Sequence, residues 1–292
     1  MDRSLLETVL APGGLRPLFQ PVVDVSDAAS VTIHYIECLM RGPVGTHLEP
    51  ANVLFDYVRL KREESLVDRA CVAAALHGLA RLDDSVRMSV NVHASTLGRD
   101  HGFVGYFQEV AEAARIDIER VTLEIVEHAP PWDGVSFLAA IADLRSLGVA
   151  IALDDVGLGL SNYKMILDVC PDYLKVDRYF VSSCDEDPKR RAVIRSIRQL
   201  GSEFGARIVA EGVERREELE TLRGLGVSLV QGFLFAEPST HPEIPRSAHE
   251  LLVREEEGGH GNVSLGAIRS KKKSDRRSRA LPSSDVLGLR DR

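Results

Sequence analysis

The sequence lacks long hydrophobic runs, paired cysteines and a leader of the secretory type. No apolar run approaches the roughly 18 residues that a membrane-spanning helix needs. The N-terminus, MDRSLLETVLAPGG, has no basic region followed by a long apolar stretch, as secretion signals do. The cysteines are scattered without a CxxC pair, which predicts reduced, buried thiols and neither disulfides nor a zinc site. They are Cys38, Cys71, Cys170 and Cys184. Together these absences predict a cytoplasmic protein with no membrane segment.

The charge is negative overall but unevenly distributed. A net charge of −8 argues against a general nucleic-acid-binding function, because nucleic acids are themselves negatively charged. Residues 257–292 carry nine Lys or Arg against four Asp or Glu, a balance of +5 that leaves −13 on the rest. This segment has no aromatic residue and little apolar content, so burial cannot offset the entropy lost on ordering it. We therefore predict a domain over residues 1–256 and a basic, disordered tail over 257–292. Contact of the tail with an anionic surface or nucleic acid is the alternative.

Strand-like runs alternate with helix-like runs over the first part of the chain. The strand-like runs are short and β-rich, and the amphipathic runs between them place apolar residues at i, i+3 and i+4. Such alternation predicts parallel strands joined by crossover helices, and eight strands in about 250 residues match a (β/α)8 TIM-like barrel. The predicted strands are 17–24, 31–41, 86–93, 120–127, 148–155, 172–177, 206–211 and 227–233. The predicted helices include 64–82, 102–116, 134–147, 187–204 and 213–225.

One connection departs from this pattern. The segment DVSDAAS, between the first two predicted strands, is too short for a crossover helix, which needs about a dozen residues. The first strand is therefore predicted to run antiparallel to the second. In two later strands, alternation places Glu124 on the same face as Thr122, and Asp154 on the same face as Ala152. These faces are predicted to line the barrel, with both carboxylates at its mouth.

Oxygen-bearing side chains stand where the predicted strands end. Carboxylates that converge at one end of a barrel repel each other, and burying them without partners is costly, so the pattern predicts a neutralising cation. Donors that are all oxygen favour Mg²⁺ or Mn²⁺ over zinc. The donors are Glu37, Asn91, Glu124, Asp154, Asp155 and Glu211. Lys175 and Gln231 occupy the same kind of position.

Several of these residues also have a purely structural interpretation. Asn91 taken alone fits a hydrogen bonder at the end of a strand. Asp154 and Asp155, before a glycine-containing loop, fit a turn or a helix N-cap through Asp155. The glycines of GLGLSN resemble a dinucleotide-binding fingerprint, but the third glycine is absent. Lys175 can pair with Asp177 or a nearby carboxylate, whereas in a metal cluster it can hold or polarise a nucleophilic water.

Together the motifs resemble those of the EAL-domain phosphodiesterases, which hydrolyse cyclic di-GMP to linear pGpG with two divalent metals. The resemblance covers about residues 15–250, in the family's order and at close to its usual separations. It implies a barrel with an antiparallel first strand, in agreement with the short connection. The motifs are FQPVVDV (19–25), ECLMR (37–41), SVNVHAS (89–95), LEIVE (123–127), DDVGLG (154–159), YLKVDRYFV (173–181), VAEGVE (209–214) and VQGFLF (230–235).

The resemblance implies a role for each matching residue, with two Mg²⁺ or Mn²⁺ ions as cofactors. One metal would be held by Glu37, Asn91, Glu124 and Asp154. The second would be held by Asp154 and Asp155, with Glu211 close by. The attacking water would be oriented or deprotonated by Lys175 and Glu211. The phosphate and guanosine end of the substrate would be bound by Gln20 and Arg41. The water and ligand shell would be supported by Gln231, and the neighbouring loops would be anchored by Glu127 and Glu214.

The chain departs from the family pattern in three places. The signature triplet reads Glu-Cys-Leu, which keeps the ligand, and the usual Arg-Trp-x-His-Pro stretch is replaced by RGPVGTHLEP. The loop usually read as DDFGTGYSS is here DDVGLGLSN, so Val156, Leu158 and Leu160 replace aromatic and hydroxyl residues. In the family this loop couples dimerisation to metal binding, which implies a homodimer. The sequence thus predicts an active phosphodiesterase, with a non-catalytic receptor for cyclic di-GMP or a partner protein as the alternative. A separate sensor or regulator protein is a further possible partner.

Overall fold

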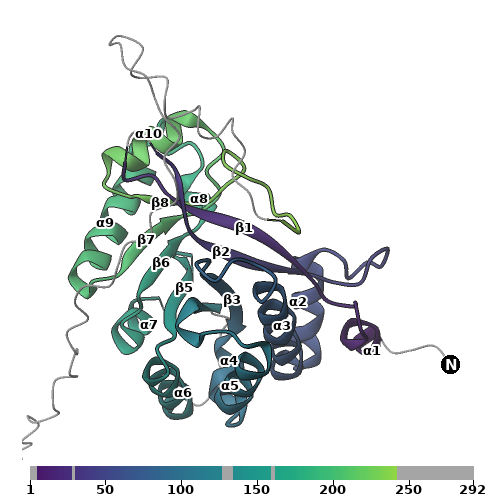
Figure 1. The fold of residues 1–292 in the computed structure, drawn as a ribbon. Coiled ribbons are helices and arrows are strands. Elements are labelled where there is room, and N and C mark those ends of the chain that lie inside the picture. The colour runs from purple at the N-terminus through teal and green to yellow at the C-terminus, as the bar shows by residue number, and fades with distance from the viewer. Residues whose placement is uncertain (1–4, 28–29, 127–133, 159–161, 242–292) are drawn as a thin grey trace, which may run out of the picture. The chain divides into compact units, whose positions relative to one another are not determined.

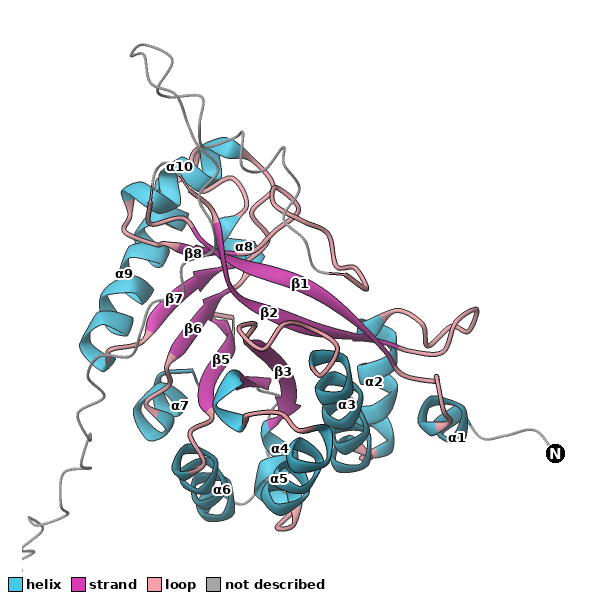
Figure 2. Ribbon diagram, in the orientation of Figure 1, coloured by secondary structure: helices cyan, strands magenta, loops and turns pink. Residues whose placement is uncertain are grey.

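The described residues form a closed barrel of eight strands with helices around it (Figures 1 and 2). The structure is a computed structural model, and it describes residues 5–27, 30–126, 134–158 and 162–241. The predicted boundary near Glu256 and the tail over 257–292 lie outside these residues. The strands are β1 (Arg16–Asp24), β2 (Thr32–Arg41), β3 (Met88–His93), β4 (Val121–Val126), β5 (Ala150–Val156), β6 (Tyr173–Val176), β7 (Arg207–Ala210) and β8 (Leu229–Val230). The TIM-like barrel predicted from the sequence is confirmed.

The direction of β1 is also as predicted. β1 pairs antiparallel with β2 on one side and with β8 on the other, and the remaining neighbouring pairs are parallel. The register of β1 and β2 places Gln20 directly opposite Glu37. Two residues that the sequence separates by the whole β1–β2 hairpin are therefore adjacent at the barrel mouth.

The helices follow the strands around the outside of the barrel (Figure 2). Each of the five predicted amphipathic runs matches a helix to within a few residues, namely α3, α5, α6, α9 and α10. For example, α9 begins at Pro188 after the capping carboxylate of Asp187 and ends before Gly205, whose φ of 68° suits glycine. Five of the described α-helices have no counterpart among the runs named from the sequence: α1, α2, α4, α7 and α8. The helices are α1 (Leu5–Leu10), α2 (Ala51–Lys61), α3 (Glu64–Leu79), α4 (Ala94–Arg99), α5 (Phe103–Ala114), η1 (Ile118–Arg120), α6 (Gly134–Ser146), α7 (Asn162–Val169), α8 (Arg178–Val181), α9 (Pro188–Phe204) and α10 (Arg216–Gly224).

The two faces of the strands belong to different packed clusters. The outward faces of β4 and β5 carry large aliphatic side chains that join the main core with the helices, among them Leu123 and Ile151. The inward faces form a smaller cluster inside the barrel. Its members are Val22, Tyr35, Ala150, Ala152, Tyr173, Val209 and Leu229. The small residues Ala150 and Ala152 thus lie below Asp154 on the inner face of β5, as the alternation predicts.

The cysteines do not all match the prediction of buried thiols. Cys38, Cys71 and Cys184 are buried, but Cys170 is exposed. Cys170 follows the last residue of α7 with a φ of 48°, and its main chain turns at the surface there. In the described part of the chain, no helix combines the length and the apolar character that crossing a membrane requires.

Candidate metal centre at the barrel mouth

Lys175 lies at the centre of the barrel mouth, surrounded by carboxylates. Its side chain is 1% exposed, and it projects inward from β6. Its Nζ lies 2.6 Å from Glu124 Oε2, 2.5 Å from Glu211 Oε1, 3.2 Å from Glu37 Oε2 and 3.5 Å from Asp154 Oδ1. These four carboxylates come from four strands or strand ends, so the barrel itself brings them to one ammonium group.

Two amides hold the carboxylate of Glu37. Asn91 Nδ2 donates to Glu37 Oε1 at 3.0 Å, and Gln231 Nε2 donates to Glu37 Oε2 at 2.8 Å. Gln231 Nε2 also lies 3.1 Å from Gln20 Oε1, and Gln20 Nε2 donates to the carbonyl of Ala236 at 2.9 Å. Glu37 is thus held directly by Asn91 on β3 and by Gln231 just after β8, and Gln20 on β1 holds Gln231 in turn.

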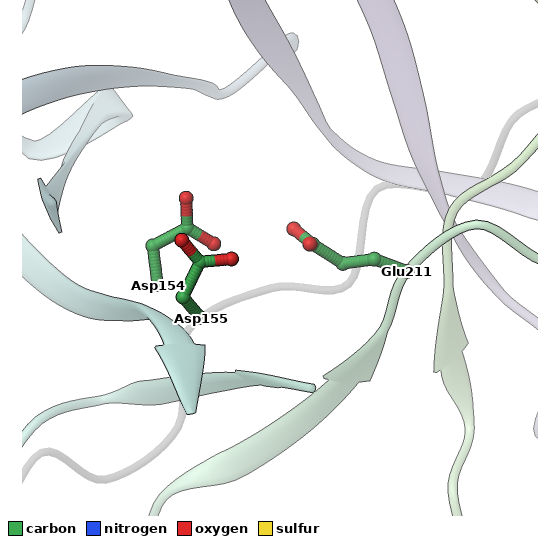
Figure 3. Close-up of side chains that lie close together, drawn as sticks. All are labelled: Asp154, Asp155 and Glu211. Carbon is green, nitrogen blue, oxygen red and sulfur yellow. The ribbon is translucent and has the colours of Figure 1, made fainter. Parts of the chain in front are cut away.

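Asp154 and Asp155 are consecutive in the chain, yet their carboxylates lie together and close to Glu211 (Figure 3). Successive residues of a regular strand point to opposite faces. Here the β5–β6 register shifts between Leu153 and Val156, and Asp155 has a φ of 52°. Such an irregularity redirects a side chain at the end of a strand. As a result, one carboxylate oxygen from each of Asp154, Asp155 and Glu211 lies within 4.8 Å of the other two.

Three of the mouth carboxylates have raised pKa values, whereas the pKa of Glu37 is lowered, because its burial is outweighed by Lys175 and the two amides. Burial, followed by the charge of Glu37, raises the pKa of Glu124 to about 8. Burial, followed by the adjacent aspartate, raises the pKa of Asp155 to about 6. Burial also raises the pKa of Glu211 well above its ordinary range, although Lys175 acts in the opposite direction. One ammonium group is therefore too little positive charge for the acidic groups around it.

The donor set fits divalent metal ions. Four buried oxygens of this cluster have no hydrogen-bond partner within the part of the chain that the structure describes. They are Asn91 Oδ1, Glu124 Oε1, Gln231 Oε1 and Asp154 Oδ1, the last of which has only the long 3.5 Å ion pair with Lys175. Buried polar atoms are normally satisfied, and carboxylate and amide oxygens are the ligands that Mg²⁺ and Mn²⁺ prefer. Because Asn91 donates its nitrogen to Glu37, the atom left for a cation is its carbonyl oxygen.

Two cavities border this cluster and share Glu37, Leu39 and Asp154 as walls. One has a volume of about 280 Å³ and extends toward α2 and α3. The other has a volume of about 300 Å³ and extends toward the ends of β6, β7 and β8. The first is lined further by Arg41, Phe55, Arg59, Asp68 and His93. The second is lined further by Gln20, Lys175, Arg178, Glu211, Gln231 and Phe233.

The remaining predicted site residues are placed as follows. Arg41 is partly buried, lines the first cavity and donates through Nη1 to the carbonyl of Met40 at 3.0 Å. Glu214 forms an ion pair with Arg178 at 2.9 Å across the rim of the second cavity. Glu127 lies outside the described residues. Lys175 does not pair with Asp177, the alternative considered from the sequence; its ion-pair partners are the four carboxylates described above. Asp177 instead accepts the main-chain N–H of Tyr179 at the start of α8.

Sequence patterns did not single out Asp68, which lies on α3 beside the first cavity. Its side chain is 1% exposed among the buried residues Val67 and Cys71. A charged residue on the apolar face of an amphipathic helix is unusual unless it is paired. This position in the helix pattern could have identified Asp68 from the sequence. Arg178 was also not singled out. It lies just after β6, and nothing in the residues around it separates it from an ordinary surface arginine.

A family model described as the EAL domain matches residues 2–238. The chain belongs to the EAL domain family. The cyclic di-GMP phosphodiesterase PA2567 of Pseudomonas aeruginosa is 27% identical over 259 residues, which cover 86% of this chain and 42% of that protein. The oxygen sensor protein DosP of Escherichia coli is 26% identical over 255 residues, covering 83% of this chain and 30% of that protein. The chain thus spans less than half the length of these curated relatives.

Solved structures of EAL proteins have the same fold. A standalone versatile EAL protein from Vibrio cholerae O395, in a form bound to c-di-GMP, is 25% identical with a TM-score of 0.71 over 80% of this chain and 97% of that one. A calcium and cyclic di-GMP complex of BlrP1 from Klebsiella pneumoniae is 25% identical with a TM-score of 0.69, covering 84% of this chain and 60% of that one.

Proposed function

We propose that this EAL domain is a metal-dependent phosphodiesterase that hydrolyses cyclic di-GMP to linear pGpG in bacterial second-messenger signalling. The observation that carries the proposal is the mouth cluster, where carboxylates outnumber the single ammonium group of Lys175 and buried oxygens lack partners. A structural ion-pair network would leave neither excess negative charge nor unpartnered oxygens, since both are costly when buried.

The cofactors in this proposal are two Mg²⁺ or Mn²⁺ ions. One is held by Glu37, Asn91, Glu124 and Asp154. The second is held by Asp154 and Asp155, next to Glu211. Bound divalent ions of this kind activate water and stabilise the charge that develops on a phosphodiester during displacement. The irregular end of β5 supports the assignment of the second ion, because it turns Asp155 toward Asp154 and Glu211.

The protein's own groups position the water and the substrate. Glu211 accepts a proton from the attacking water, and its contact with Lys175 at 2.5 Å keeps the carboxylate directed into the mouth. Lys175 keeps Glu211 and Glu124 in place and orients the water. Gln20 and Arg41 bind the phosphate and guanosine end of the substrate. Gln231 supports the water and the metal ligands through its hydrogen bond to Glu37. Glu127 and Glu214 anchor neighbouring loops, and the Glu214–Arg178 ion pair supports the second of these roles.

The two cavities support a substrate with two bulky halves joined by phosphates. They meet at Glu37 and Asp154, so a molecule that occupies both places its middle over the carboxylates. Cyclic di-GMP has this form, with a guanosine on either side of a ring of two phosphodiesters. Phe233, which is 56% exposed at the rim of the second cavity, offers an aromatic face to a base. A cyclic mononucleotide would fill only one cavity.

We further propose that the protein acts in the cytoplasm as a homodimer, with a separate sensor or regulator as a possible partner. Exposed apolar side chains gather on α6 and α7, two helices in contact with each other, and on the loop before α7. They are Val135, Leu138, Leu158, Tyr163 and Leu167. A second copy of the chain that covers them would also contact the loop that follows Asp155. This agrees with the coupling between dimerisation and metal binding that the family resemblance implies.

The test is incubation of the purified protein with cyclic di-GMP and Mn²⁺ or Mg²⁺, followed by chromatographic detection of pGpG. Chelation should abolish the product, and Glu37→Gln, which keeps the shape of the side chain but removes its charge, should do the same. Release of two GMP molecules without accumulation of pGpG would contradict the assigned product.

The alternative function is a receptor that binds cyclic di-GMP or a partner protein without hydrolysis. The observation that favours it is the altered loop, in which Leu158 is half-exposed where the family carries a hydroxyl residue. Calorimetry with cyclic di-GMP separates the two functions. Binding with no pGpG at saturating Mn²⁺ supports the receptor, whereas turnover supports the enzyme.

A further inference from the structure

The chain turns sharply just after Asn91. β3 ends at His93 and α4 begins at Ala94, so no loop separates the strand from the helix. The direction of the Asn91 side chain therefore depends on how the last residues of β3 are held. α4 gives little help, because His93 at its N-cap makes no capping bond through its own side chain.

The carboxylate of Asp68, on α3, holds this turn. Asp68 Oδ2 accepts the main-chain N–H of His93 at 2.9 Å and the hydroxyl of Thr96 at 2.5 Å. Asp68 Oδ1 lies 2.9 Å from Nδ1 of the His93 ring. Asp68 is 1% exposed and Thr96 is fully buried, so water does not compete for these bonds. A single buried side chain thus fixes both the end of β3 and the first turn of α4.

A small displacement of Asn91 would change which atoms its side chain can reach. Its Nδ2 donates to Glu37 at 3.0 Å, and this bond leaves Oδ1 as a buried oxygen without a hydrogen-bond partner in the described structure. A shift of the main chain at His93, two residues away, would move Oδ1 away from a cation that also touches Glu37. Residues that orient a metal ligand in this way commonly change metal affinity without touching the metal.

We infer that Asp68 is a positioning residue for Asn91 in the metal centre, an inference that rests on the proposed function. Asp68 is not itself a ligand, because both of its oxygens are engaged by the β3–α4 turn. Its role is to hold the end of β3 so that the carbonyl oxygen of Asn91 stays directed at the metal.

The same two helices are joined at a second place, which provides a matched control. Arg69, the next residue of α3, donates from Nε and Nη2 to the two oxygens of Asp100, each at 2.7 Å. Asp100 is the C-cap of α4, at the end of the helix remote from Asn91. Loss of Asp100 should therefore weaken the packing of α4 on α3 without disturbing the end of β3.

The experiment is calorimetric titration of the full chain with Mn²⁺, in the absence of substrate, together with thermal unfolding. Asp68→Ala should lower Mn²⁺ affinity by about 10- to 100-fold, the range seen when partners of metal ligands are removed. Asp68→Asn should have a smaller effect, because an amide keeps one accepting oxygen. Asp100→Ala should lower the melting temperature and leave Mn²⁺ affinity unchanged. If Asp68→Ala fails to fold, Asp68→Asn carries the same comparison.

A double variant shows whether Asp68 acts through Asn91. In an Asn91→Ala background, Asp68→Ala should change Mn²⁺ affinity by less than about twofold, because the residue it positions is absent. A further loss of about tenfold in that background would overturn the inference, as would an equal loss in Asp100→Ala. Wild-type protein that binds Mn²⁺ no better than Asp68→Ala overturns only the inference. Wild-type protein that binds no Mn²⁺ overturns the metal centre and the inference with it.

Discussion

Lys175 and Glu124 form an ion pair in which only one of the two carboxylate oxygens is used. Lys175 Nζ lies 2.6 Å from Glu124 Oε2, whereas Glu124 Oε1 is buried and has no hydrogen-bond partner among the described residues. The ammonium group of Lys175 thus pairs with Oε2. In the proposed metal centre, Oε1 is the oxygen that would bind a metal ion. Asn91 is divided in the same way, because its Nδ2 donates to Glu37 while its Oδ1 is buried without a hydrogen-bond partner among the described residues.

Glu37→Ala should abolish turnover while the protein stays folded. The substitution removes a ligand from a shared metal site, whose residues act as a unit, so kcat/KM should fall by about 10³-fold or more. The measurement is the rate of pGpG release at saturating Mn²⁺, with circular dichroism to confirm folding. Glu112→Ala, an exposed position on α5, is the control and should behave as wild type. Unchanged pGpG production by Glu37→Ala would refute the metal assignment.

Lys175→Met should destabilise the metal-free protein more than the metal-loaded one. Removing the ammonium leaves several buried carboxylates without a counter-charge, a change that costs about 3–5 kcal/mol when one partner of a buried pair is lost. Saturating Mn²⁺ should restore part of this loss. The measurement is urea unfolding with and without Mn²⁺. Lys164→Met removes an exposed ion pair with Asp168 on α7 and should cost about 0.5 kcal/mol or less. Equal Mn²⁺ stabilisation of Lys175→Met and wild type would contradict the charge argument.

The loop after Asp155 should limit metal affinity, giving weak Mg²⁺ binding and a preference for Mn²⁺. From the sequence, the double variant Val156→Phe/Leu158→Thr is expected to improve activity. The structure makes its two halves unequal, because Val156 is 3% exposed within the main core, whereas Leu158 is 50% exposed. A larger ring at a packed position costs about 1–3 kcal/mol through overpacking. Leu158→Thr adds the hydroxyl without that penalty.

We therefore expect Leu158→Thr alone to raise Mn²⁺ affinity and Val156→Phe alone to lower the melting temperature. A metal titration of activity at fixed substrate, run on both single variants and on the double variant, measures the first effect. If neither variant nor the wild type hydrolyses cyclic di-GMP at saturating Mn²⁺ while binding persists, the receptor function stands in place of the enzyme.

His34 should make the protein less stable in mild acid. At the end of the barrel remote from the metal centre, burial and then Arg207 lower the pKa of His34 to about 4, against an ordinary value of about 6.5. The folded protein thus binds this proton more weakly than the unfolded chain. Stability is complete above pH 6.5 and is lost as the pH falls toward 4, by about 2 kcal/mol between pH 7 and 4.5. Urea unfolding at these two pH values should show a smaller loss for His34→Asn than for wild type. An equal loss in both would show that His34 does not titrate in this way.

Deletion of residues 257–292 should leave metal-dependent hydrolysis and the melting temperature nearly unchanged. The segment has no aromatic residue and a net positive charge, so it has little to bury against the barrel. Thermal unfolding and pGpG release of the truncated chain measure the effect. A large drop in melting temperature would show that the tail packs on the barrel and that the boundary near Glu256 is misplaced.

Periodicity in the sequence predicts regular elements and fails where the main chain becomes irregular. Alternation places Glu124 inside the barrel because it lies within regular pairing of β4. It still places Asp154 there because Asp154 directly follows the last regularly paired residue, Leu153. It cannot place Asp155, whose direction depends on a register shift and a positive φ. The same limit explains Cys170, which ends a short helix at the surface and was wrongly predicted to be buried. Asp68 was missed because its partners, His93 and Thr96, become its neighbours only when α3 packs against β3.

The reversed direction of β1 decides from which end the polypeptide enters the barrel. Arg16, the first residue of β1, stands opposite Arg41, the last residue of β2, and so lies on the same side as the carboxylates. In a barrel whose strands are all parallel, the chain would arrive at the opposite end. The segment that precedes Arg16 therefore reaches the barrel at the end where Glu37 and Lys175 lie, and not at the far end of the strands.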